Sequence, residues 1–141
     1  MGYYTRHTGE ISIVPPLAWS EIKDSPFVCL PGQRGYGRDL KIVLDETTEE
    51  TSDGTLIRRR GIAIAPVTTE PMKGYRIVEE LQSLLNCHAE GQRFIGFIEA
   101  EGEDPGDLWR LMVKDGQAVQ IKPRIIWPDE DWSEDDEDAR F

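Results

Sequence analysis

The chain has 141 residues, of which 38% are hydrophobic and 30% charged, a composition typical of one globular domain. No run of about 18 apolar residues occurs, which excludes a membrane-spanning helix, and the lack of an apolar stretch at the N-terminus favours the cytoplasm. The formal net charge is −11, from 16 basic and 27 acidic residues. This excess argues against direct binding to nucleic acid, which depends on clustered Lys and Arg.

The first third of the chain predicts a strand, a short helix and a loop. Residues 4–14 alternate loosely between polar and apolar side chains, as a half-buried strand does. We expect Pro15 and Pro16 to end this strand, because proline cannot donate to a ladder. Residues 17–22 suffice for one or two helical turns, and the glycine-rich run 31–38 predicts a loop.

A long β-hairpin is predicted for residues 39–65. Residues 40–44 alternate with the period of a strand, and Asp53-Gly54 is a strong reverse-turn pair. The return strand, residues 55–65, has no face that is apolar throughout. A β-bulge near Arg60-Gly61 would switch the register and resolve this conflict.

The clearest helix is predicted for residues 72–88. Its apolar side chains recur at i, i+1, i+4, i+7 and i+8 and form one stripe, made of Ile77, Val78, Leu81, Leu84 and Leu85. Pro71 suits the first turn of such a helix. Glu79 and Glu80 fall off the stripe, so we expect both in solvent.

The last third predicts a meander of three strands. Residues 93–101 are apolar on both faces, which indicates a central strand, and residues 108–113 follow as the next one. A second Asp-Gly turn leads to a last strand from Val119 to Trp127, in which Pro123 indicates a bulge or an edge position. We expect Trp19, Trp109 and Trp127 in the core.

Together these elements predict an α+β fold, a mostly antiparallel sheet of about six strands with one main helix packed on one face. A closed small barrel is the alternative. The single domain is expected to cover residues 1–128. Residues 129–141 form an acidic tail, which we expect to be disordered because like charges repel and cannot bury apolar surface.

Two stretches of the chain resemble a known family. The first, residues 1–22, begins Met-Gly-Tyr-Tyr-Thr, and the second, residues 101–128, contains Gly-Asp-Leu-Trp-Arg at 106–110. They resemble a group of short uncharacterised proteins, a domain of unknown function, from actinobacteria and their phages. That family has no assigned catalytic or binding residues, so the resemblance implies no site. The association with phages implies a small interaction protein rather than a metabolic enzyme.

Three carboxylates, Glu99, Glu101 and Glu103, share one strand face by parity, and Asp104 and Asp107 follow them. Carboxylates at this density can bind a hard cation or shift one another's pKa, which makes a small metal-dependent hydrolase one candidate function. Their spacing does not match a calcium loop, and the alternative is a solvated strand end and turn. We predict no cofactor.

The histidines and cysteines lack the spacing of a catalytic or metal site. A catalytic pair of His7 and His88 would have to meet in space, and no motif supports it. Cys29 and Cys87 are far apart and show no CxxC spacing, so we expect them to be reduced and inert.

Arginine and an aromatic residue alternate with glycine in the predicted loop, which contains Arg34, Tyr36 and Arg38. If folding brings this loop to Arg58 and Arg60, the resulting basic patch could bind a phosphate or a nucleotide. The loop matches neither of the phosphate-binding glycine motifs. Alternatively, the arginines neutralise nearby acids across the hairpin.

Trp132 lies inside the acidic tail. Acidic residues with an isolated aromatic are typical of a short linear motif that becomes ordered on a partner, with Trp132 as the anchor. The leading hypothesis is therefore a non-enzymatic protein-interaction module whose tail engages a basic protein surface or mimics nucleic acid. Exposed edge strands could also pair two copies of the chain.

Overall fold

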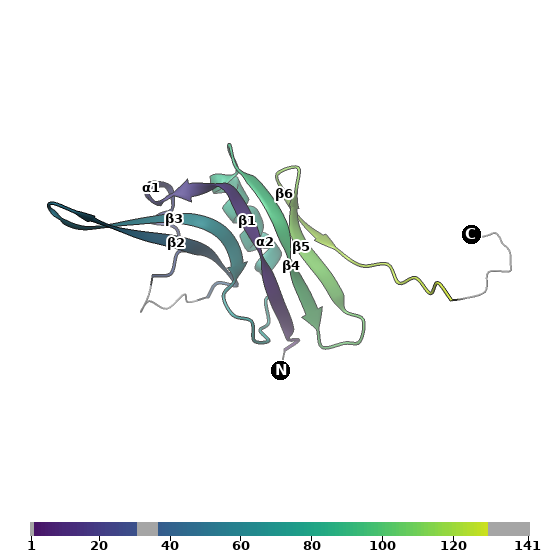
Figure 1. Ribbon diagram of the computed structural model, residues 1–141. Helices are drawn as coiled ribbons and strands as arrows, with labels where there is room; N and C mark the ends of the chain where they lie inside the picture. The colour runs from purple at the N-terminus through teal and green to yellow at the C-terminus, as the bar shows by residue number, and fades with distance from the viewer. Residues whose placement is uncertain (1, 31–36, 130–141) are drawn as a thin grey trace.

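The computed structural model describes residues 2–30 and 37–129. It shows one six-stranded sheet in the order β2-β3-β1-β4-β5-β6, in which every neighbouring pair is antiparallel (Figure 1). The strands are β1 (Thr5–Ala18), β2 (Leu40–Thr51), β3 (Gly54–Pro66), β4 (Arg93–Gly102), β5 (Leu108–Lys114) and β6 (Gln117–Ile121), and the helices are α1 (Trp19–Ile22) and α2 (Ile77–His88). The predicted α+β class is confirmed. The sheet is open, with β2 and β6 as its edges.

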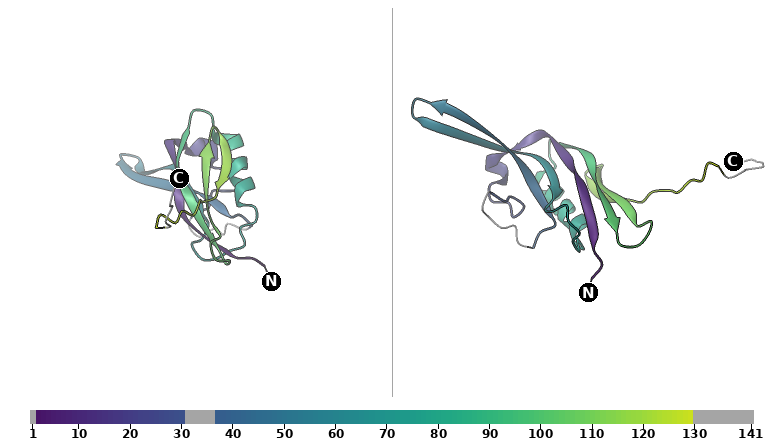
Figure 2. Two further views of the ribbon diagram at one scale, coloured as in Figure 1. Left: turned by 90° about the vertical axis from the view of Figure 1, so that its right-hand side faces the viewer. Right: turned by 60° about the horizontal axis from the view of Figure 1, so that its bottom comes forward.

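One face of the sheet carries the core. The long helix α2 lies against this inner face alone, as the left view of Figure 2 shows. Its stripe is buried as predicted, and the core combines it with inward side chains of the strands: Ile11, Ile13, Leu17, Leu40, Ile42, Ile64, Ile98 and Leu111. Trp19 and Trp109 pack against this core, also as predicted. Within the described residues, no helix is long and apolar enough to cross a membrane.

Strand β1 continues through the two prolines, so the prediction that they end it was wrong. The pairing of β1 with β4 stops at Val14, and its pairing with β3 skips from Ser12 to Leu17. Pro15 and Pro16 therefore occupy the interval in which no ladder donor is required. The peptide bond between Val14 and Pro15 is cis.

A β-bulge in the hairpin is confirmed close to its predicted place. Val43 pairs with Ala63 but the next residue of β2 pairs with Gly61, so Ile62 is the extra residue of β3. Gly61 sits where the inner face is crowded. A Cβ at this position would come within 2.9 Å of Ile42 and 3.0 Å of Ile22, which explains why the position needs glycine.

Helix α2 begins five residues later than predicted. The backbone of Met72 pairs with Thr5, with N–H donated in both directions at 2.8 and 3.0 Å. Gly74 then adopts a positive φ of 57°, which reverses the chain before the helix. Because Met72 uses its backbone groups in this bridge, the first helical turn is displaced to Ile77.

Two glycines lie close together on adjacent strands in the middle of the sheet. Gly9 of β1 and Gly96 of β4 have φ values of 98° and 104°, a region that favours glycine. Gly9 pairs with Ile98, and Gly96 pairs with Ile11, so the two kinks are neighbours on adjacent strands. A Cβ on Gly9 would come within 2.8 Å of the carbonyl oxygen of Phe97.

Candidate functional site

The sheet face opposite α2, here called the outer face, is not covered by any helix of residues 2–30 and 37–129 (Figures 1 and 2). Alternate residues of β4 point to it, as do those of β1, β5 and β6. Large apolar side chains are exposed on this face, namely Val14, Ile95, Phe97, Leu108 and Ile121. The sequence analysis inferred a central strand from the two apolar faces of β4. The strand is central, but the long helix α2 covers only the inner face of the sheet, so the apolar side chains on the other face of β4 stay exposed.

Arg110 organises the middle of the outer face. Its guanidinium lies 4.1 Å from the centre of the Phe97 ring, and its Nε donates to Glu99 at 3.3 Å. A groove of about 220 Å³ lies beside it, lined by Glu99, Leu108, Trp109, Arg110, Ile121, Lys122 and Pro123. The groove thus combines apolar side chains with two cations, Arg110 and Lys122, and one carboxylate, a combination suited to an aromatic side chain with a polar edge.

The chain leaves the sheet after β6 as an exposed segment, residues 122–129, here called the C-terminal extension. It has no strand or helix up to residue 127, so the predicted last strand reaching Trp127 was wrong: β6 ends at Ile121. Pro123 follows at once and cannot donate to a ladder, which explains the early end. Figure 1 shows the extension running away from the domain.

Three consecutive large apolar side chains of the extension face solvent. Ile125, Ile126 and Trp127 are 71%, 64% and 66% exposed. The prediction that Trp127 belongs to the core was therefore wrong. The sequence signal that could have revealed this is the pair Pro123 and Pro128, which brackets the segment and excludes it from a paired strand.

The arginines of the hairpin are paired across its two strands. Arg58 contacts Glu49 at 3.6 Å, and Arg60 contacts Asp45 at 3.0 Å. Arg59 pairs with Glu46. These contacts are the cross-strand neutralisation that the sequence analysis gave as the alternative to a binding patch.

Arg38 lies at the opposite end of the hairpin from Arg58. Its guanidinium sits 5.4 Å from the centre of the Phe27 ring. Leu40, two residues after Arg38, pairs with Pro66, whereas Arg58 pairs with Thr47. Seven residues of β2, roughly 23 Å, therefore separate Leu40 from the position of Arg58. The structure therefore does not bring Arg38 to Arg58 and Arg60.

Three of the predicted binding residues lie outside the described residues. These are Arg34 and Tyr36 of the glycine-rich run and Trp132 of the acidic tail.

The acidic run after the middle of β4 is used to anchor the N-terminal segment. Glu99 and Glu101 share the outer face as predicted, but β4 ends at Gly102 and Glu103 lies beyond it. Glu103 instead accepts the backbone N–H of Tyr4, at 2.5 Å. Within residues 2–30 and 37–129, no group of three His, Cys, Asp or Glu side chains is placed to hold a metal ion.

Tyr3 joins the same turn through its hydroxyl, which donates to Asp107 and accepts the N–H of Asp104 at 3.0 Å. The hydrogen bond to Asp107 raises the pKa of this phenol above its ordinary value. We expect Tyr3→Phe to lower the free energy of unfolding, because it removes both hydrogen bonds of the hydroxyl. Urea unfolding measures it, with Tyr4→Phe, at an exposed position, as a control that leaves both contacts intact; an unchanged midpoint for Tyr3→Phe would show that the two contacts add nothing.

The two histidines do not meet. His7 is 1% exposed, neither of its ring nitrogens has a hydrogen-bond partner among the residues that the structure describes, and the ring lies against Gly74 before the start of α2. Burial lowers the pKa of His7, against an opposing effect of the Asp39 carboxylate. His88 ends α2, about 18 Å further along the helix. The structure therefore offers no catalytic histidine pair.

Two clefts flank the C-terminal end of α2, a feature that the sequence analysis missed. One of about 510 Å³ is lined by Leu17, Glu21, Cys87, His88, Glu90 and Gln92, and one of about 390 Å³ lies between the same end of α2 and residues 20–27. Cys87 is exposed there. It is not joined to Cys29 in a disulfide.

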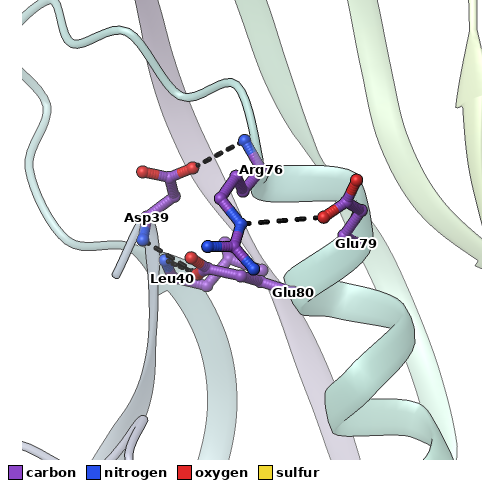
Figure 3. A network of polar contacts seen from close by, with 5 residues as sticks. All are labelled: Asp39, Leu40, Arg76, Glu79 and Glu80. Carbon is purple, nitrogen blue, oxygen red and sulfur yellow. Dashed lines mark hydrogen bonds and ion pairs between the residues drawn. The ribbon is translucent and has the colours of Figure 1, made fainter. Parts of the chain in front are cut away.

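Figure 3 shows the polar network that joins α2 to β2. Glu80 is 5% exposed and accepts the backbone N–H groups of Asp39 and Leu40 at 2.8 and 3.0 Å. Asp39 in turn accepts the N–H of Arg76, whose side chain pairs with Glu79. Burial raises the pKa of Glu80, although the two backbone hydrogen bonds oppose this. The expectation that Glu80 is solvated was wrong, because these two N–H groups need an acceptor.

Comparison with known proteins gives a family but no function. No curated protein and no solved structure matches the chain. One family, described as "Family of unknown function (DUF6205)", matches residues 1–141. An origin in actinobacteria or their phages stays a prediction. The match confirms the resemblance to a domain of unknown function, and the chain belongs to the DUF6205 family.

Proposed function

We propose that this protein is a non-enzymatic interaction module whose C-terminal extension docks on a partner protein. The observation that carries the proposal is the exposure of Ile125, Ile126 and Trp127 on a segment that leaves the domain (Figure 1). Burying such side chains on a partner releases roughly 1.5–3 kcal/mol each before the cost of ordering. Tryptophan is also among the residues that most often dominate interfaces.

The charge that follows the apolar residues suits the same role. Asp129 closes the described part of the extension, and the sequence continues with Glu130, Asp131, Trp132 and further acidic residues. Carboxylates next to an apolar anchor speed the encounter with a basic surface and favour such a surface over an acidic one. A partner with basic side chains around an apolar groove fits this segment.

The two other candidate functions receive less support from the geometry. A phosphate site would need Arg38, Arg58 and Arg60 together, whereas Arg58 and Arg60 already pair with hairpin carboxylates and Arg38 is remote. A hydrolase would need Glu99, Glu101 and Glu103 around one cation, whereas Glu99 pairs with Arg110 and Glu103 accepts a backbone N–H.

The proposal is tested by changing the extension alone. The variant I125S/I126S/W127S keeps the domain and the acidic residues but removes the apolar anchor. In cross-linked cells of the host, we expect a tagged full chain to capture partners that this variant captures at least about tenfold less, since losing 1.4 kcal/mol of binding already costs a factor of ten.

The matched control is L56S/I57S, which removes two exposed apolar residues of the hairpin. It should capture the same partners as the unchanged chain, and in a lysate without cross-linking 0.5 M salt should reduce that capture. Equal capture by the extension variant and the unchanged chain would contradict the proposal.

A further inference from the structure

We propose that the partner of the C-terminal extension is a second copy of this chain. Ile125, Ile126 and Trp127 of each copy dock on the outer face of the other, and the result is a twofold symmetric dimer. This inference rests on the proposed function, whose docking segment it uses. One chain carries both an exposed apolar segment and an exposed apolar face, so two copies satisfy each other's surfaces with two identical contacts.

The groove beside Arg110 fits the Trp127 side chain of the other copy. Its volume is about 220 Å³, and a cavity of about 150 Å³ already accepts benzene, so an indole can enter. Leu108 and Ile121 supply apolar contact. The Arg110 guanidinium, about half exposed, can stack on the indole as it does on Phe97, and the Glu99 carboxylate can accept the indole N–H.

The two cations of the extension are complementary to carboxylates of the outer face, and in this inference they, not the acidic residues that follow Trp127, provide the electrostatic attraction. The extension carries two cations, Lys122 and Arg124, immediately before its apolar residues. The outer face carries Glu10 and Glu101 at the borders of its apolar area. None of these four side chains takes part in an ion pair within the described ranges 2–30 and 37–129. Docking between copies brings the cations to the carboxylates.

The extension is poorly placed to reach the groove of its own chain. Pro123 is itself part of the groove wall, so only three residues separate the wall from Trp127. Folding back would require a tight turn within Arg124, Ile125 and Ile126. Glycine, asparagine and proline form such turns, whereas adjacent β-branched residues favour an extended backbone. The extension runs away from the domain in Figure 1 and in the right view of Figure 2.

Sedimentation velocity on the full chain tests this arrangement. We expect a dimer at about 100 µM that dissociates on dilution. Trp127→Ala removes the donor side chain, and Leu108→Glu damages the acceptor groove at an exposed position. Each variant alone should be monomeric at this concentration. Ile57→Ser, exposed on the hairpin, should remain dimeric, and circular dichroism and thermal melting check that all three variants are folded.

Mixing the two monomeric variants gives the decisive measurement. Trp127→Ala keeps an intact groove and Leu108→Glu keeps an intact extension, so an equimolar mixture regains one of the two contacts. We expect a mixed dimer whose dissociation constant is at least tenfold larger than that of the dimer of the unchanged chain. Contacts between edge strands β2 or β6 would instead leave Trp127→Ala dimeric.

Three results would overturn the inference: a monomeric full chain at about 100 µM, a dimer unaffected by Trp127→Ala, or no mixed dimer. Its failure is distinguishable from failure of the proposed function. A monomeric chain that still loses its cellular partners in I125S/I126S/W127S would leave the proposed function standing and place the partner outside this chain. If I125S/I126S/W127S kept both the dimer and the cellular partners of the unchanged chain, this inference and the proposed function would both be refuted.

Discussion

Replacing Gly9 with alanine is expected to lower the free energy of unfolding by about 4 kcal/mol. Gly9 has a φ of 98°, where an L side chain costs about 1–2 kcal/mol. The added Cβ would also stand 2.8 Å from the carbonyl oxygen of Phe97, an overpacking that costs about 1–3 kcal/mol. This oxygen belongs to a central strand held on both sides, so it cannot move away at low cost.

Gly54→Ala is the matched control for this effect. Gly54 has a φ of 126°, but a Cβ at this position would meet nothing within 4 Å. It therefore isolates the backbone cost, and we expect a loss of about 1–2 kcal/mol. Urea unfolding of both variants separates strain from crowding. If Gly9→Ala cost no more than Gly54→Ala, the crowding between β1 and β4 would be disproved.

Replacing Glu80 with alanine is the second large effect, with an expected loss of about 3 kcal/mol. The change leaves the N–H groups of Asp39 and Leu40 without their acceptor, and an unsatisfied buried donor costs about 1–3 kcal/mol. Glu80→Gln keeps an acceptor oxygen and removes the buried charge, so it should cost less than about 1 kcal/mol. Chemical denaturation at pH 7 measures both. Equal losses would show that the negative charge of the carboxylate, which both variants remove, provides the stabilisation, and that an uncharged acceptor oxygen does not suffice.

The same residue should make stability depend on pH in a defined direction. The pKa of Glu80 in the folded protein lies above its ordinary value of 4.5, because burial disfavours the charged form. The folded state therefore holds this proton more tightly than the unfolded state. Relative to Glu80→Gln, the unchanged chain should be most stable below pH 4.5 and lose stability as pH rises through the raised pKa. A difference that grows with rising pH would contradict this assignment.

Local chemistry explains why much of the fold could be predicted from the sequence. The stripe of α2, the hairpin turn and the bulge at Ile62 follow from side-chain periodicity, and periodicity depends on neighbours along the chain. Gly9 and Gly96 are different. A glycine in a strand indicates close backbone approach only when the partner strand is known, and here the partner lies almost ninety residues away.

The remaining errors have the same origin in tertiary contacts. The sequence alone predicts Met72 to be helical, because its bridge with Thr5 cannot be seen in the sequence. It also predicts Glu80 to be exposed, because the sequence does not show that the start of β2 lies beside it. The candidate site was missed because the apolar residues on both faces of β4 were taken to indicate a central strand, and the exposure of one of these faces was not considered. Counting helices would have corrected this, since one helix cannot cover two faces.

The position of β1 in the sheet has a consequence for synthesis on the ribosome. β1 is made first but lies between β3 and β4, and its partners in β4 emerge about eighty-five residues later. Until then Ile11 and Ile13 have no completed core to enter, and closing so long a loop is slow. The nascent chain therefore carries its future central strand unprotected until β4 is made, and a chaperone that binds short apolar segments has its target in β1.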